Sequence, residues 1–130
     1  MINVPGVVLD SSAFLAVLHG EPGGDVVEAR LHQAAMSSVN WAEVVQKALA
    51  RGLTMRNLEQ DFRKYGLSII PFTAEDAEMT AQLWAPTRHR GLSLGDRACL
   101  ATGLRLGLPV LTGDRSWSGL DLGVQVHLFR

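Results

Sequence analysis

Residues 7–10 have the sequence Val-Val-Leu-Asp, and residues 109–114 have the sequence Pro-Val-Leu-Thr-Gly-Asp. Each stretch contains an apolar run without polar alternation, which is typical of a strand buried on both faces of a parallel sheet. An aspartate follows directly in the first case and just past the strand in the second. The two stretches therefore predict an α/β domain with an acidic side chain beyond the carboxyl end of each strand.

Strand and helix patterns alternate along the rest of the chain. Gly52, Gly66 and Gly107 follow predicted helices, as expected of residues that end them. Such alternation predicts a doubly wound parallel sheet with helices on both faces. The predicted strands are 7–9, 35–37, 68–71, 109–112 and 124–128, and the predicted helices are 12–18, 25–32, 41–51, 54–65, 73–84 and 94–106.

Length and composition indicate one compact domain, spanning residues 1–130. The chain is 47% hydrophobic, and no stretch approaches the ~18 apolar residues of a membrane span. Residues 1–9 lack the pattern of a secretory signal, and the single cysteine, Cys99, cannot form an internal disulfide, so a reducing cytoplasm is expected. The formal net charge of -1 indicates no general affinity for nucleic acid, so any such affinity must be local.

Topology places two further acids on the edge where the strands end. Glu43 is predicted in the first turn of the helix that follows strand 35–37, and Asp96 in the first turn of the helix that leads into strand 109–112. The connector 85–92 must return to that edge, and at ~3.3 Å per extended residue it is long enough. The predicted cluster consists of Asp10, Glu43, Asp96 and Asp114.

Four carboxylates on one edge repel one another unless a cation neutralises them. An all-oxygen set suits Mg²⁺ or Mn²⁺, and the lack of cysteine or histidine beside these acids argues against zinc. Such an ion can polarise a phosphodiester and lower the pKa of water, and phosphoryl transfer needs little else from a protein. The pattern predicts metal-assisted hydrolysis of a phosphodiester.

Each acid also has a purely structural interpretation. Asn40 with Glu43, and Ser93 with Asp96, have the spacing of N-cap and N3 partners, so both acids can simply cap helices. Capping does not explain why four acids from four segments map to one edge.

The other residues near the acids leave two interpretations open. Asp10 and Asp114 can be turn residues. Ser12 either orients Asp10 or caps the helix that it opens, and Thr112 either assists Asp114 or is an ordinary strand residue. The four histidines are scattered and are interpreted as surface residues.

Basic side chains near the acids are candidates for RNA binding. Arg88, His89 and Arg90 form a short basic run before Asp96, although a solvated loop is the default interpretation. Arg97 and Arg115 each follow a proposed acidic ligand, so they either contact RNA or form local ion pairs.

Four motifs, in this order and spacing, resemble those of PIN domains. They are Val-Val-Leu-Asp-Ser-Ser-Ala at 7–13, Asn-Trp-Ala-Glu-Val at 40–44, Leu-Ser-Leu-Gly-Asp-Arg-Ala at 92–98 and Val-Leu-Thr-Gly-Asp-Arg at 110–115. Within that family they look most like the VapC-type toxins of bacterial toxin-antitoxin pairs. The likeness covers essentially the whole chain.

The resemblance implies a single three-layer α/β domain, with a five-stranded parallel sheet between helices, and an endoribonuclease that depends on Mg²⁺ or Mn²⁺. It also implies a homodimer, inhibited by an antitoxin whose C-terminal segment wraps the toxin near its active site. Ser12 and Thr112 match the usual hydroxyl positions of the family. The implied metal ligands are Asp10, Glu43, Asp96 and Asp114.

Two other functions compete with this one. Haloacid dehalogenase-like phosphatases also begin with an apolar strand that ends in aspartate, but they carry a second aspartate where this chain has Ser12. The non-enzymatic alternative is a doubly wound binding module in which the acids only cap helices and turns.

Overall fold

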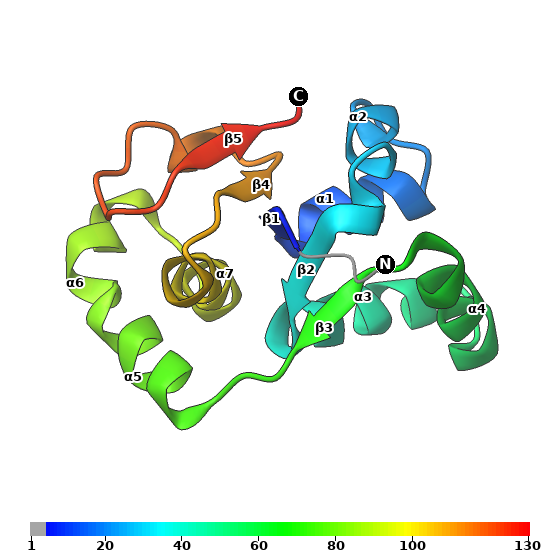
Figure 1. The fold of residues 1–130 in the computed structure, drawn as a ribbon, viewed down its shortest axis with the longest axis horizontal. Helices are drawn as coiled ribbons and strands as arrows, with labels where there is room; N and C mark the ends of the chain where they lie inside the picture. The colour runs from blue at the N-terminus through cyan, green and yellow to red at the C-terminus, as the bar shows by residue number, and fades with distance from the viewer. Residues whose placement is uncertain (1–4) are drawn as a thin grey trace.

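The computed structural model describes residues 5–130, apart from the side chains at positions 62 and 63. Five parallel strands form one sheet in the order β3-β2-β1-β4-β5 (Figure 1), which confirms the predicted α/β fold. The strands are β1 (Val7–Leu9), β2 (Ala34–Ser37), β3 (Ser68–Ile70), β4 (Val110–Thr112) and β5 (Val126–Leu128). Residues 1–4, part of the predicted domain and of the segment predicted to lack a secretory signal, lie outside the described residues.

Helices connect the strands and cover the sheet. The α-helices are α1 (Ser11–Leu18), α2 (Gly24–Glu28), α3 (Ser38–Ala50), α4 (Met55–Tyr65), α5 (Ala74–Gln82), α6 (Trp84–Thr87) and α7 (Leu94–Leu106). Three short 3-10 helices are η1 (Leu31–Gln33), η2 (Arg88–Arg90) and η3 (Arg115–Trp117). No helix within residues 5–130 is both long and apolar enough to cross a membrane.

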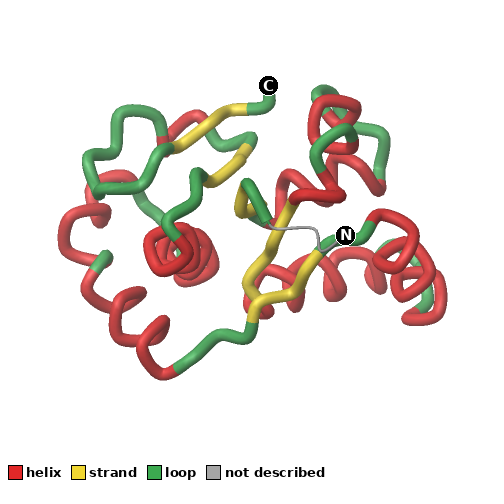
Figure 2. The backbone as a smooth tube through the Cα atoms, viewed as in Figure 1, coloured by secondary structure: helices red, strands yellow, loops and turns green. Residues whose placement is uncertain are grey.

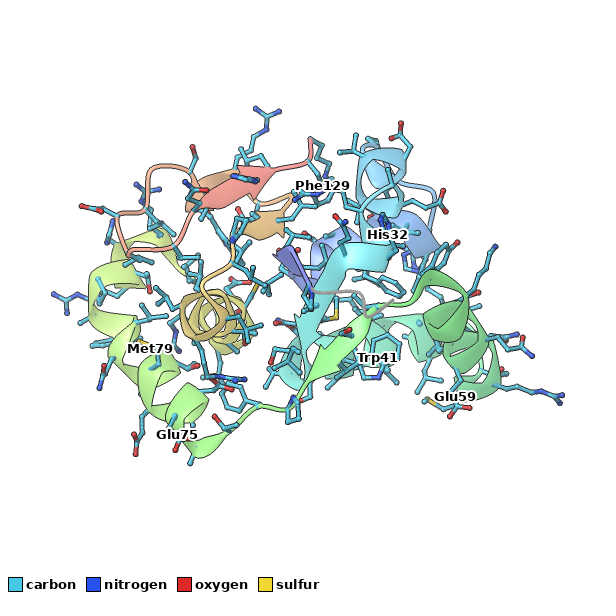
Figure 3. All side chains as sticks on the ribbon, viewed as in Figure 1. His32, Trp41, Glu59, Glu75, Met79 and Phe129 are labelled. Carbon is cyan, nitrogen blue, oxygen red and sulfur yellow. The ribbon has the colours of Figure 1, made fainter. Side chains whose placement is uncertain are left out.

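The central strand β1 is buried on both faces, as its apolar run predicts. Val7 and Leu9 pack with Phe14 of α1 in one core cluster, whereas Val8 packs with Leu100 of α7 in a second cluster. Alternate side chains of a strand point to opposite faces, so the two clusters lie on opposite sides of the sheet. Figure 2 shows the corresponding layers, with α7, α5 and α6 on one side and α1 to α4 on the other.

The strand order reverses direction beside β1. The chain moves from β1 to β2 and β3, and then crosses to β4 on the other side of β1. In open parallel sheets, ligands bind outside the carboxyl ends of the strands at such a reversal. Asp10 follows β1 and Thr112 ends β4, so the fold places both residues at this point.

Helix α3 begins earlier than predicted, which corrects the position of Glu43. The hydroxyl of Ser37 accepts a hydrogen bond from the backbone N–H of Val39 at 3.2 Å and acts as the N-cap. Asn40 is therefore inside the helix rather than its N-cap, and Glu43 lies in the second turn rather than the first. Because Ser37, the last residue of β2, already caps the helix, Asn40 is not needed as an N-cap.

Two other predicted segments were also wrong. The connector 85–92 is not extended, because it contains the end of α6 and all of η2. Pro86 is compatible with α6 because the N–H groups of a first turn have no helical partner. The predicted helix 25–32 is interrupted, with α2 ending at Glu28 and a separate 3-10 helix following.

A buried ion pair joins α5 to α7 and so helps to fix the helix that carries Asp96. The carboxylate of Asp76 is 2% exposed, and its Oδ1 accepts from Nε of Arg105 at 2.6 Å. Burial favours the neutral acid, but the hydrogen bonds from Arg105 and Thr73 outweigh it and lower the pKa of Asp76. Gly107 ends α7 in the left-handed conformation, with φ of 67°, as its position after the predicted helix indicates.

Candidate active site

Asp10 lies at the centre of a hydrogen-bonded network between β1, α1 and β4. Its Oδ1 accepts from the hydroxyl of Ser12 at 2.7 Å and from the backbone N–H of Ala13 at 3.0 Å, which makes it the N-cap of α1. Its Oδ2 accepts from the hydroxyl of Thr112 at 2.5 Å. Asp10 is 4% exposed. Both of its carboxylate oxygens are thus held in fixed directions.

Burial makes this carboxylate hard to ionise. Desolvation is the largest effect on Asp10, and it raises the pKa to about 6 even though three hydrogen bonds favour the charged form. The negative charge of Asp96 raises the pKa further. Asp96 therefore lies close enough to Asp10 for the two charges to interact.

Asp114 is connected to Asp10 through the end of β4. The hydroxyl of Thr112, which donates to Asp10, accepts from the backbone N–H of Asp114 at 3.0 Å. The hydroxyl of Ser12 likewise accepts from the N–H of Gly113 at 3.1 Å. The carboxylate of Asp114 is exposed and also accepts from the N–H of Ser116 at 2.9 Å, which is the predicted turn role. Ser12 and Thr112 therefore both orient Asp10 and join it to the loop that carries Asp114.

Glu43 approaches the same region from α3. The side-chain Nδ2 of Asn40 donates to Oε1 of Glu43 at 2.8 Å and to the backbone carbonyl of Gly95 at 2.9 Å. Both partners are acceptors, so the amide orientation of Asn40 follows from the network. A Cβ at Gly95 would lie 2.6 Å from Oε1 of Glu43, so the Glu43 carboxylate lies directly against the first turn of α7.

Asp96 lies in the first turn of α7, as predicted. Ser93 and Asp96 form a capping box, in which Oδ2 of Asp96 accepts from the N–H of Ser93 at 2.9 Å. The prediction of a capping role is thus confirmed for Asp96. Its half-buried side chain nevertheless lies beside the other acids.

The buried thiol of Cys99 reports the combined charge of three acids. Burial raises the pKa of Cys99 well above its ordinary value, and the charges of Asp10, Asp96 and Glu43 raise it further. Since such interactions weaken with distance, all three carboxylates lie within electrostatic range of Cys99. The topological argument from the sequence is consistent with this placement.

The donors suit a hard divalent cation, but they do not form a closed ligand set in this conformation. Across residues 5–130, no group of three or more histidine, cysteine, aspartate or glutamate side chains is positioned to hold one metal ion together. The candidate ligands are all carboxylates, which Mg²⁺ and Mn²⁺ prefer. A nearby cation would stabilise the buried Asp10 carboxylate, whose raised pKa shows that it lacks compensating charge. The chemistry of the site therefore fits such an ion.

The four arginines predicted to contact RNA have different environments. Arg90 donates to the backbone carbonyls of Ser116 and Ser118 at 2.7 and 2.8 Å, and Arg97 donates to the carbonyl of Thr80 at 2.8 Å. These two guanidinium groups hold loops and helices together. Two others are exposed, namely Arg88, whose guanidinium lies 5.7 Å from the ring centroid of Trp84, and Arg115.

Sequence reasoning missed the environments of two polar residues. Asn40 was interpreted only as a helix cap, yet it is 1% exposed and positions Glu43. Its burial could not be seen without the start of α3. His19 was grouped with surface histidines, but its Nε2 is buried and has no hydrogen-bond partner among the described residues.

Thr112→Val should destabilise the protein, because it removes the hydroxyl that joins Asp10 to Asp114 while keeping the side-chain shape. We expect the free energy of unfolding to fall by about 1–3 kcal/mol, the cost of leaving buried polar groups unpaired. Chemical denaturation measures this change. Thr102→Val is the matched control, since the Thr102 hydroxyl donates only to the carbonyl of Ala98 within α7. Equal losses in both variants would contradict the linking role of Thr112.

Several solved structures resemble this chain over nearly its full length. A toxin-antitoxin complex from Klebsiella pneumoniae matches with a TM-score of 0.68 and 24% identity, over 92% of this chain and 95% of that chain. DNA-bound VapBC from Salmonella typhimurium matches with a TM-score of 0.72 and 17% identity, over 98% and 100%. FitAcB from Neisseria gonorrhoeae matches with a TM-score of 0.66 and 23% identity, over 92% and 95%.

The family of the chain follows from a sequence comparison rather than from the structural likeness. No curated protein sequence is significantly similar to the chain. The solved structures are all less than 25% identical to it and support the fold alone. A model of the PIN domain family, however, matches residues 7–121, which include all four acids. The chain therefore belongs to the PIN domain family.

Proposed function

We propose that this PIN-domain chain is an endoribonuclease that depends on Mg²⁺ or Mn²⁺ and acts as the toxin of a toxin-antitoxin pair. The observation that carries the proposal is the environment of Asp10. A buried carboxylate with a raised pKa lies at the switch point of the sheet, within electrostatic range of Asp96, and none of the cationic side chains that the structure describes is bonded to it. Perturbed acids at such a position are typical of functional sites.

The roles of the residues follow from their positions. When bound, a divalent cation supplies Lewis-acid stabilisation of phosphoryl oxygens and lowers the pKa of water. Asn40, Ser12 and Thr112 position the acids without contacting substrate. The proposed metal ligands are Asp10, Glu43, Asp96 and Asp114.

The proposed partners come from the structural neighbours. The Klebsiella protein is described as part of a toxin-antitoxin complex, and the Salmonella protein as part of DNA-bound VapBC. By analogy, the chain is proposed to bind a cognate antitoxin. The likeness of its four motifs to those of VapC-type toxins is the ground for proposing that it also forms a homodimer and acts on RNA in the cytoplasm. Finding an antitoxin gene beside the gene for this chain would support that part of the proposal.

Metal binding tests the proposal independently of activity. Calorimetric titration with Mn²⁺ should give measurable binding to the chain, and Asp114→Asn should weaken it by about tenfold or more, since one charged ligand is lost. Asp121→Asn, an exposed change outside the cluster, is the matched control. RNA cleavage by the unmodified chain should stop when EDTA removes the metal and return when Mn²⁺ is added in excess.

The competing functions make different predictions. A binding module with capping acids shows neither Mn²⁺ binding nor RNA cleavage. A phosphatase of the haloacid dehalogenase type hydrolyses p-nitrophenyl phosphate in a metal-dependent reaction and leaves RNA intact. Either result refutes the endoribonuclease.

A further inference from the structure

A pocket with basic walls opens beside the acids, between α1 and α3. Its volume is about 440 Å³, and it is lined in part by Ser12, whose hydroxyl donates to Asp10 at 2.7 Å. The pocket therefore begins at the active site. Lys47, Arg51 and Arg130 also line it, together with the half-buried His19.

Helix geometry explains how acids and cations come to share one surface. Glu43 and Lys47 are four residues apart on α3, so they lie on the same face, separated by about 6 Å along the axis. Arg51, the C-cap of α3, extends this face by another turn. Ser12 and His19 are seven residues apart on or next to α1 and share a face in the same way. The surface thus changes from acidic at the catalytic edge to basic along the groove.

The charge of this groove is only partly neutralised by the protein. Its one acid, Glu21, lies 3.8 Å from Arg130. Lys47 and Arg51 make no ion pair and no side-chain hydrogen bond with any residue that the structure describes. This contrasts with Arg90 and Arg97, whose guanidinium groups donate to backbone carbonyls. Arg130 is intermediate, because its exposed guanidinium donates to the carbonyl of Pro22 at 3.3 Å.

Arg130 connects the basic groove to the loop of Asp114. Its Nε lies 2.9 Å from the position that a Cβ on Gly113 would occupy, so the guanidinium lies against the glycine that precedes Asp114. The half-buried ring of His19 also lines the groove, although its Nε2 is buried. A phosphate oxygen in the groove would accept from the cationic side chains.

We propose that this groove binds the phosphate backbone of the RNA on one side of the bond to be cut, with Lys47, Arg51 and Arg130 as its phosphate contacts. The inference rests on the proposed endoribonuclease function and adds the path that the substrate takes. Backbone contacts of this kind hold a strand in register without reading its bases. The groove therefore contributes affinity rather than sequence preference.

The test is the salt dependence of RNA binding. Binding of a short fluorescent single-stranded oligoribonucleotide is measured by anisotropy in EDTA, so that no cleavage occurs, for the unmodified chain and for the double variant Lys47→Glu/Arg51→Glu. We expect the affinity to fall by about tenfold or more, and the slope of log K against log salt to decrease by about 1.4, since each single-strand phosphate contact contributes about 0.7. The control is Arg56→Glu combined with Lys64→Glu, both on the exposed surface of α4, which makes the same change in net charge.

The outcomes separate this inference from the proposed function. Equal losses of affinity in the double variant and in the control pair would overturn the groove and indicate a non-specific effect of net charge. Unchanged RNA binding in the double variant, with normal cleavage in Mn²⁺, would also overturn the groove but leave the endoribonuclease intact. If the unmodified chain binds RNA tightly but does not cleave it in Mn²⁺, the endoribonuclease is refuted instead. Circular dichroism distinguishes lost binding from loss of the α3 C-terminal turn, where both cations also favour the helix dipole.

Discussion

Asp10→Asn is expected to reduce RNA cleavage by at least about a thousandfold, because losing several kcal/mol of charge stabilisation at a metal site corresponds to a rate loss of that size. Asparagine keeps the size of the side chain and one acceptor oxygen, so the N-cap to Ala13 can persist. Single-turnover cleavage of RNA in saturating Mn²⁺ measures the loss. Asp121→Asn, which removes one charge outside the cluster, should retain full activity.

The same substitution should stabilise the metal-free protein at neutral pH. The pKa of Asp10 is raised from 3.8 to about 6 in the folded state. Below pH 3.8 Asp10 is protonated in both the folded and the unfolded state, so its full contribution to the free energy of unfolding is present. Between pH 3.8 and 6 the unfolded state loses this proton first, and the free energy of unfolding falls until the pH has passed the folded pKa. The loss amounts to about 3 kcal/mol by pH 8, at 1.36 kcal/mol for each pKa unit.

Denaturation of the two proteins between pH 4 and 8, in EDTA, measures this difference. The gain from Asp10→Asn should grow between pH 4 and about 6 and then stay constant up to pH 8, although the amide Nδ2 that faces Thr112 reduces its size. Mn²⁺ at pH 7 should raise the Tm of the parent and leave that of Asp10→Asn unchanged. If the difference in free energy of unfolding between the unmodified chain and Asp10→Asn does not change with pH, the burial argument is contradicted. If Mn²⁺ raises the Tm of both proteins equally, the role of Asp10 in metal binding is contradicted.

The sequence predicted the strands well because their signal is local. The apolar runs at 7–9 and 109–111 avoid water only where a strand is buried on both faces. The strands β1 and β4 are found at these positions and are buried. Helix boundaries were predicted less well, because several nearby side chains can serve as the N-cap and the sequence does not show which one does. Ser37 capped α3, and this moved Glu43 by almost one turn relative to the prediction.

The placement of the acids followed from topology, whereas their supporting contacts did not. A parallel sheet brings strand ends together whatever the detailed packing, and Asp10 and Asp96 do lie within electrostatic range. The contact of Asn40 with Gly95 joins residues 55 positions apart, and no local pattern encodes it. The hydrogen-bond partners of the basic residues could not be predicted for the same reason, since Arg90 and Arg97 donate to carbonyls on distant segments.

Gly95 is an unusual residue for the first turn of a helix, and the structure explains why it is there. Glycine inside a helix costs about 1 kcal/mol relative to alanine, so its presence in the first turn of α7 calls for a compensating reason. That reason is space, because a Cβ would lie 2.6 Å from Oε1 and 2.7 Å from Cδ of Glu43. The lack of a side chain at this helix position leaves room for an acid from α3 at the proposed active site.

Gly95→Ala should therefore lower activity without lowering stability. The obstructing atoms belong to the far end of a flexible side chain, so the Glu43 carboxylate can move aside and the helix can accept the methyl group. The Tm should stay constant or rise, because alanine favours the helix. The kcat/KM for RNA cleavage should fall by about a hundredfold, which is the usual effect of displacing a catalytic group by about 1 Å.

A double-mutant cycle between positions 43 and 95 tests whether the effect passes through Glu43. In a Glu43→Ala background, the added methyl group of Gly95→Ala meets no carboxylate and should change kcat/KM little further. The two losses would then be strongly non-additive, as expected for residues in contact. Additive losses would show that the methyl group disturbs RNA directly, and full activity of Gly95→Ala alone would remove Glu43 from the catalytic set, because its carboxylate cannot remain in place beside that methyl group.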